Sequence, residues 1–348
     1  MTGQEFIAAF SKKGYAAWEA AALELARQGK LTPWPWVDVT LSNGEDRAVV
    51  KVSSDVLAVG PLEDFVRLPL TPVTAQNILN LSGALMTTPW LEHQIWRAAP
   101  VKLQPISAAA MKQTNLGANL AQYVEHSRRI DEQLRALNIK PGALVSGTKK
   151  GIVVSNIWSP LGDVAGNRRG KVNIAGWYRP PPAPDVFDDH KALGADDRQP
   201  IQPNSDAHGD FYVDYSHGVR AVAPFALVNG QPMATVDLYT HPTLSKLVSH
   251  NGPIKLPRYP GTTVSPATPP PPIAGPASNS PEQAFDLGPL LHPPNPGPEQ
   301  IALEALQPST GNLAAARGCW PFSYFAPLTR PLPRAEDGAW WRPRRRGH

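Results

Sequence analysis

The fold class follows from residues 37–52, which read VDVTLSNGEDRAVVKV. Apolar and polar side chains alternate on both sides of Asn43-Gly44, a dipeptide typical of tight turns between antiparallel strands. This pattern predicts a β-hairpin. Upstream, residues 6–25 place apolar side chains at helical spacing, and Gly29 follows where a helix C-cap belongs. A helix and a hairpin in one chain indicate the α+β class.

The chain up to about residue 256 continues both patterns. Helices are expected at residues 71–83, 88–96 and 116–137, and the first two begin with Thr-Pro, which suits an N-cap and first helical position. Strands are expected at residues 56–60, 143–146, 151–154, 172–178, 211–215 and 219–222, with a second hairpin turn at Asn229-Gly230 and a short helix at 244–248. The sequence therefore predicts N-terminal helices and a mostly antiparallel sheet over residues 36–240.

Composition limits the architecture further. The 348 residues are 42% hydrophobic, enough for a real core, but they include 40 prolines, which exclude a continuous helical bundle or coiled coil. Half of these prolines lie at or beyond residue 257, so we expect a mostly disordered or polyproline tail there. We divide the chain into a mainly helical part with a hairpin (1–140), a β-rich part (141–256) and the proline-rich tail (257–348).

Cysteine content and charge exclude several protein classes. The single cysteine, Cys319, excludes an internal disulfide framework, a cysteine-rich zinc site and an iron–sulfur cluster. The net charge is +4, and four arginines lie in residues 341–346. For that arginine-rich end, a solvated terminus is favoured over nucleic-acid binding.

Targeting signals are not visible in the sequence. No stretch reaches the roughly 18 apolar residues needed to span a bilayer. The first 30 residues mix charged and apolar side chains, unlike a signal peptide. We expect a protein that works in the cytoplasm, leaves by a route that the sequence does not show, or lacks its leader in this chain.

The densest polar cluster is residues 206–220, DAHGDFYVDYSHGVR. If residues 210–216 form a strand, alternation places Asp210, Asp214 and Ser216 on one face. His208 precedes the strand by an even number of residues and would point to the same side. Glycines at 209 and 218 bracket the segment and allow tight turns or close approach of a ligand.

Three interpretations of this cluster remain open. One is a serine hydrolase, in which a histidine oriented by Asp214 activates Ser216. A second is a zinc site, in which His208, Asp214 and His217 bind the metal and a bound water attacks the substrate. In the third, the segment is structural, and its polar groups bond one another.

Part of the cluster resembles a known signature. The run Ser216-His217-Gly218-Val219-Arg220, preceded by His208-Gly209, resembles the active-site signature of bacterial L,D-transpeptidases. That family has a nucleophilic cysteine at the place between Gly218 and Val219, where this chain has no residue, and the spacing of the two histidines is shorter here. The resemblance covers about thirteen residues, and it implies a cell-wall polymer as the substrate class.

The sequence therefore predicts a hydrolase that acts on a cell-envelope polymer such as peptidoglycan or polysaccharide. The proposed catalytic residues are His208, Asp214, Ser216 and His217. The proposed substrate contacts are Lys150 and Arg220, which would bind anionic groups, together with Trp177 and Tyr215. The alternative is a non-catalytic binding or structural protein, associated with a phage or with secretion, that uses aromatic and basic surface residues.

Overall fold

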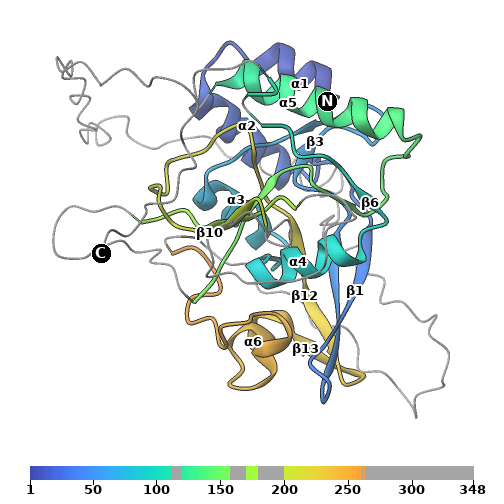
Figure 1. Cartoon of the computed structure of the whole chain (residues 1–348). Helices are drawn as coiled ribbons and strands as arrows, with labels where there is room; N and C mark the ends of the chain where they lie inside the picture. Colours follow the sequence, from blue (N-terminus) through green and yellow to red (C-terminus); the bar gives the residue numbers. More distant parts are fainter. Residues whose placement is uncertain (108, 112–118, 157–169, 179–199, 261, 263–348) are drawn as a thin grey trace, which may run out of the picture. The chain divides into compact units, whose positions relative to one another are not determined.

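The hairpin that residues 37–52 predict is present and sets the register of the main sheet. In the computed structural model, β1 (Trp36–Ser42) pairs antiparallel with β2 (Arg47–Ser53), and Val39 lies opposite Val50 (Figure 1). Val39, Leu41, Val50 and Val52 are buried, because alternation places them all on the core face. The structure describes residues 1–107, 109–111, 119–156, 170–178, 200–260 and 262.

The main sheet pairs strands from the N-terminal part of the described chain with strands near its C-terminal end. Its order is β1-β2-β12-β13, and β5 (Leu85–Met86) also pairs with β12 (Ala221–Val228). β12 and β13 (Gln231–Ala234) form the second predicted hairpin, whose turn residues Asn229 and Gly230 both have positive φ, as a two-residue hairpin turn requires. Because β12 pairs with β2, the helical N-terminal part and the β-rich part share one core.

A second sheet carries the candidate cluster. Its order is β10-β9-β8-β11, from β8 (Lys150–Ile152), β9 (Ile174–Gly176), β10 (Gln202–Ser205) and β11 (His217–Gly218). β8 and β11 run parallel, and the other pairs are antiparallel. Two short pairs complete the strands: β3 (Ala58–Val59) with β4 (Val66–Arg67), antiparallel, and β6 (Val101–Lys102) with β7 (Val145–Ser146), parallel.

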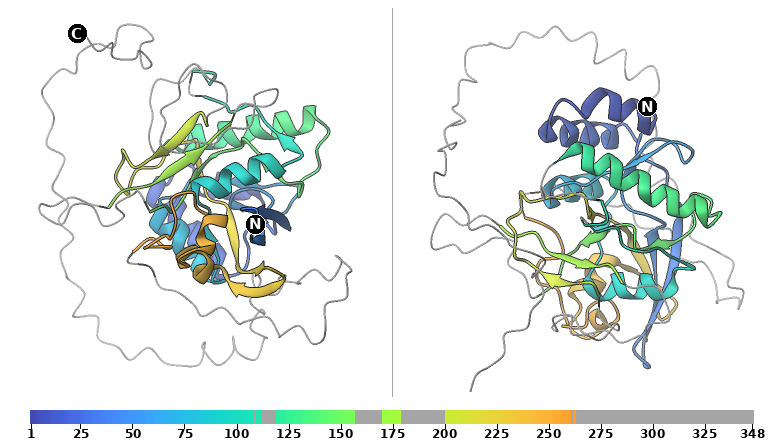
Figure 2. Two further views of the ribbon diagram at one scale, coloured as in Figure 1. Left: turned by 60° about the horizontal axis from the view of Figure 1, so that its bottom comes forward. Right: turned by 45° about the horizontal axis from the view of Figure 1, so that its top comes forward.

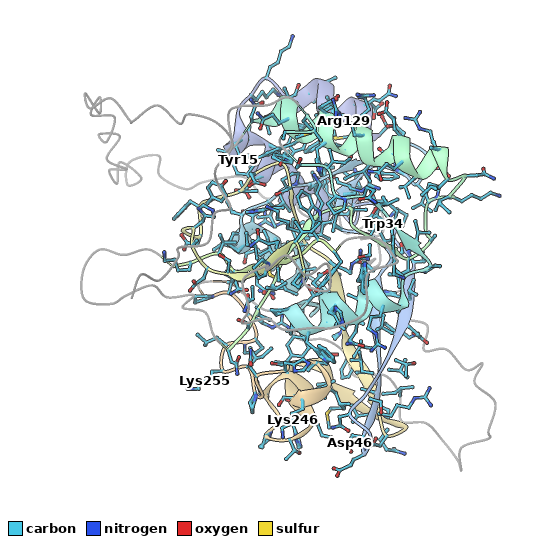
Figure 3. The ribbon with its side chains drawn as sticks, in the orientation of Figure 1. Tyr15, Trp34, Asp46, Arg129, Lys246 and Lys255 are labelled. Carbon is cyan, nitrogen blue, oxygen red and sulfur yellow. The ribbon has the colours of Figure 1, made fainter. Side chains whose placement is uncertain are left out.

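Helices cover these sheets from two ends. α1 (Gly3–Phe10), α2 (Tyr15–Arg27) and α5 (Leu120–Ala136) lie at one end, and α6 (Thr235–Thr240) lies beside β13 at the other (Figures 1 and 2). The remaining helices are α3 (Pro72–Asn80), α4 (Pro89–Ala98) and the 3-10 turn η1 (Leu244–Leu247). Phe6 and Trp18 join α1 to α2, with ring centroids 4.6 Å apart. The labelled charged side chains of Asp46, Lys246 and Lys255 lie at the outside (Figure 3).

The α+β prediction is confirmed, and three element predictions need correction. The predicted N-terminal helix is two helices, α1 and α2. The helical conformation is interrupted between them, where Gly14 has a φ of 85°. Residues 58–59 pair with β4 instead of extending the main sheet. Residues 210–216 do not form a strand. α5 begins at Leu120, where Asn119 caps its first amide groups, and the predicted helical residues 116–118 lie outside the described residues.

All described residues belong to one compact unit. The predicted disordered tail lies outside the described residues from residue 263 onward. Within the described ranges, none of the helices combines the length and the apolar character that crossing a bilayer requires.

Candidate functional site

The parallel pairing of β8 with β11 brings the two sequence clusters together. Lys150 lies opposite His217, and Gly151 lies opposite Gly218. Neither glycine leaves room for a side chain without a shift: a Cβ on Gly218 would lie 2.7 Å from the Lys149 Cβ, and one on Gly151 would lie 2.7 Å from the Glu92 Oε1 of α4. Residues opposite each other in neighbouring strands share a face, so Lys150 and His217 lie side by side.

Asp214 is held by a tight turn just before β11. Its Oδ1 accepts hydrogen bonds from the Ser216 backbone N–H (2.8 Å) and from the Ser216 hydroxyl (2.5 Å). Its Oδ2 accepts a hydrogen bond from the Tyr212 hydroxyl (3.1 Å) and lies 3.8 Å from the His217 Nε2. This turn, rather than strand alternation, is what brings Asp214 and Ser216 together.

The environment fixes the charge states of the Asp214–His217 pair. Burial alone would raise the pKa of Asp214, but His217, Lys150 and the hydrogen bonds from Ser216 together lower the pKa of this carboxyl well below its usual range. Burial lowers the pKa of His217 to about 4, although Asp214 opposes that shift. At neutral pH the site therefore holds an ionised carboxylate beside a neutral imidazole.

Several buried polar atoms of the site lack a hydrogen-bond partner among the described residues. Neither ring nitrogen of the fully buried His217 has one, and neither does the Trp177 indole N–H. Trp177 also has a φ of 57°, an uncommon conformation for a bulky side chain. The Lys150 ammonium lies 4.9 Å from the Trp177 ring centroid. Unsatisfied buried groups and a strained backbone gather where ligands or ordered waters bind.

A lysine–histidine pair that sequence reasoning missed lies behind the site. The buried Lys149 ammonium is 2.9 Å from the His126 Nδ1 and also donates to the Tyr215 carbonyl. Burial lowers the pKa of Lys149 to about 7, and it also lowers the pKa of His126. The His126 Nε2 lies 3.2 Å from the Ile106 carbonyl, so Nε2 carries the proton and Nδ1 accepts.

One sequence signal could have identified His126. It stands in the buried stripe of α5, three residues after Tyr123 and four before Ile130. A histidine in an otherwise apolar stripe indicates a polar partner inside the core.

The predicted catalytic residues do not all converge. Ser216 is fully buried, and its hydroxyl donates to Asp214 rather than to a histidine. His208 is exposed and stacks on Tyr212, with ring centroids 4.0 Å apart, and the edge of Tyr212 contacts His217 at 5.6 Å. The Tyr212 ring therefore lies between His208 and His217, and His208 does not stack directly on His217.

Two of the predicted substrate contacts, Arg220 and Tyr215, are buried in the structure. Arg220 is buried, and its guanidinium donates to the backbone carbonyls of Ser53 and Val145. Tyr215 is buried against His126, with ring centroids 4.9 Å apart. Lys150 lies opposite His217, and Trp177 lies beside the Lys150 ammonium; their contact with a substrate stays a prediction.

The zinc interpretation finds no ligand set in the described part of the chain. No three histidine, cysteine, aspartate or glutamate side chains gather there in a group that could hold a metal. His208, Asp214 and His217 do not form such a group, because His208 stacks on Tyr212 instead of joining the other two. Cys319 lies outside the described residues.

Comparison of the chain with protein-family models, with curated proteins and with solved structures finds no match. The resemblance to L,D-transpeptidases therefore rests on residues 208–220 alone.

Proposed function

We propose that the protein is a hydrolase that acts on a cell-envelope polymer, with His217 as the general base and Asp214 as the residue that positions it. The observation that carries this proposal is the buried, neutral His217 imidazole without a hydrogen-bond partner in the described residues, 3.8 Å from the Asp214 carboxylate. Three hydrogen bonds, two from Ser216 and one from Tyr212, fix that carboxylate. In a general base of this kind the carboxylate accepts a hydrogen bond from the imidazole, so the proposal requires Asp214 and His217 to close from 3.8 Å to hydrogen-bond distance when substrate binds.

The same contacts favour water over Ser216 as the nucleophile. The Ser216 proton is already donated to Asp214, so the serine has no base to activate it. A neutral His217 would instead take a proton from water, and the water oxygen would attack the substrate carbonyl. The resulting imidazolium, stabilised by Asp214, would return the proton to the leaving group. The Lys150 ammonium and the Trp177 N–H are the groups nearby that could stabilise the negative charge on the carbonyl oxygen.

The carboxylate content of the site favours an amide or ester bond over a glycosidic bond. Most glycosidases need two carboxylates that flank the scissile bond. Here the described residues bring a single carboxylate, Asp214, against His217. The cell-wall substrate class itself comes from the transpeptidase resemblance, so within that class we propose the peptide or ester linkages of peptidoglycan.

Release of soluble fragments from purified peptidoglycan tests this proposal. We expect His217→Asn to lower turnover by about 10²- to 10⁴-fold, the usual contribution of general acid–base catalysis, with an unchanged far-UV circular dichroism spectrum. His250→Asn is the matched control, because His250 is an exposed histidine that contacts Trp90 of α4. Equal fragment release by wild type and His217→Asn would contradict the proposal.

One observation favours the second candidate, a non-catalytic binding protein. Phe211 is 67% exposed beside the stacked rings of His208 and Tyr212, which makes an aromatic surface next to the site. Such surfaces are typical of interaction sites. If wild type sediments with peptidoglycan, releases no fragments, and Phe211→Ala abolishes the sedimentation, the binding function is supported and the hydrolase is not.

A further inference from the structure

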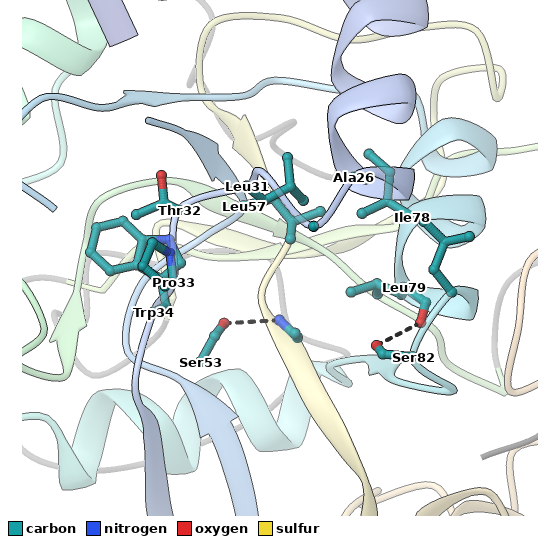
Figure 4. A pocket seen from close by; sticks show the side chains of 13 residues that line it. Ala26, Leu31, Thr32, Pro33, Trp34, Ser53, Leu57, Ile78, Leu79 and Ser82 are labelled. Atoms are coloured by element: carbon teal, nitrogen blue, oxygen red, sulfur yellow. Dashed lines mark hydrogen bonds between the residues drawn. The ribbon is translucent and has the colours of Figure 1, made fainter. Parts of the chain in front are cut away.

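An apolar pocket lies between α2, α3 and the segment that follows α2. In Figure 4, Pro33 and Trp34 line one side and Ile78 and Leu79 line the opposite side. Leu31 and Leu57 lie between them, and Leu81, which is 37% exposed, adds to the lining. The space between these side chains is about 660 Å³ when its open mouth is included, so the pocket is an open apolar groove rather than an enclosed cavity. None of its lining residues is charged.

The described chain ends at the border of this pocket. The Arg258 guanidinium donates to the Asn80 side chain (2.5 Å) and to the carbonyls of Ala84 (2.7 Å) and Gly83 (2.8 Å). Gly83 directly follows the pocket residue Ser82 in the chain. The Tyr259 backbone N–H also reaches the Gln76 side chain of α3. These contacts fix residues 258–259 at the end of α3 that borders the pocket.

The segment that comes next matches the pocket in chemistry and in reach. Residues 263–281 contain no aspartate, glutamate, lysine or arginine, and they include Val264, the four prolines at 269–272 and Ile273. In a polyproline helix, ten residues span roughly 31 Å, so residues 264–273 have ample length to cross the end of α3. Proline-rich segments suit apolar grooves because they lose little conformational entropy on binding.

We infer that residues 264–273 of the same chain occupy the apolar pocket between α2 and α3. The pocket is then an intramolecular docking site for the start of the proline-rich tail. This inference is independent of the proposed hydrolase.

Disulfide trapping in the full chain tests the inference. In a Cys319→Ser background, we would combine Ser82→Cys at the rim of the pocket with Ala267→Cys in the segment. The control pairs the same Ala267→Cys with Leu137→Cys, at an exposed leucine directly after α5. The rate of intrachain disulfide formation under mild oxidation would be measured by peptide mass spectrometry.

We expect the Ser82 pair to form its disulfide at least about tenfold faster than the control, because docking raises the local concentration of one thiol near the other. Leu81→Asp, a change on the partly exposed lining, should reduce that rate toward the control value. A synthetic peptide of residues 263–275 should slow the trapping by competition. Equal rates for the two pairs, no effect of Leu81→Asp, or disulfides mainly between two chains would overturn the inference.

Discussion

Two buried polar clusters adjoin the same short segment, residues 148–150, and they differ in how completely their groups are bonded. In the first, Arg67 is fully buried and donates to Asp55 at 2.7 and 2.9 Å and to Asp131 at 2.6 Å. Asp55 also accepts from the Thr148 hydroxyl and from the Val56 backbone N–H. Arg67 and Asp55 thus have their charges and hydrogen bonds met within the protein.

The second cluster, around His217, is incomplete. The His217 ring nitrogens and the Trp177 indole N–H have no hydrogen-bond partner among the described residues, although both side chains are buried. A protein that only needed stability could have satisfied or removed these groups, because unsatisfied buried polar atoms destabilise the fold. The difference separates a cluster whose polar groups are bonded within the protein from one that has unpaired groups among the described residues, and the proposed function rests on the second.

The largest expected effect concerns the complete cluster. Arg67→Met would leave Asp55 and Asp131 without their cation, and we expect the free energy of unfolding to fall by about 3–5 kcal/mol. Urea denaturation would measure it. The matched control is Arg128→Met, which breaks exposed pairs with Glu125 and Glu132 and should change the free energy of unfolding far less, because solvent and salt screen such pairs. Equal losses in the two variants would show that the Arg67 cluster is not a structural centre.

The next effect is the acid sensitivity that His217 confers. Its pKa is about 4 in the folded protein, against about 6.5 in an unfolded chain, so the unfolded state binds more protons between these values. Stability should therefore fall as the pH drops from about 6.5 to about 4, by up to about 3 kcal/mol, and this contribution should level off below pH 4.

His217→Asn isolates that contribution. The lowered pKa of His126 acts in the same direction in both proteins, so it cancels in the comparison. The stability difference between wild type and variant should therefore change by about 3 kcal/mol between pH 7 and pH 4, with the wild type losing more. Parallel curves from urea titrations at each pH would contradict a buried, neutral His217.

The smallest effect separates the two roles considered for Ser216. Ser216→Ala removes one hydrogen bond to Asp214 and leaves those from the backbone N–H and Tyr212. We expect a loss of about 1–2 kcal/mol in stability and a turnover that stays within about tenfold of wild type. Complete loss of turnover with full stability would instead identify Ser216 as the nucleophile.

The sequence predicts the elements whose signals lie within a few neighbouring residues. The hairpin at residues 37–52 and the Thr88-Pro89 start of α4 follow from alternation and capping within a few residues. The break at Gly14 was not predicted because the apolar spacing continues across it. The segment before β11 was predicted as a strand from its aromatic residues, but the hydrogen bonds from Ser216 to Asp214 hold it in a turn.

For the candidate site, too, local sequence patterns predict only part of the arrangement. Residue types alone singled out Asp214 and His217 as candidates, and in the structure their side chains lie 3.8 Å apart. Their link to Lys150 depends on a parallel strand pair between segments more than 60 residues apart, which no local pattern specifies. Arg220 was expected to bind an anion, but it directly precedes β12 of the main sheet, where backbone carbonyls of Ser53 and Val145 accept from it.

The pH dependence of kcat/KM for peptidoglycan hydrolysis, in wild type and in Asp214→Asn, tests the central claim most directly. This quantity reports the ionisation of the free enzyme, so the wild-type rate should fall on the acid side with a midpoint near pH 4, the pKa of His217. Removing the Asp214 charge should lower that pKa, and the midpoint should move to lower pH while turnover falls by orders of magnitude. A midpoint near 6.5 that Asp214→Asn leaves in place would contradict the assignment of His217 as the base.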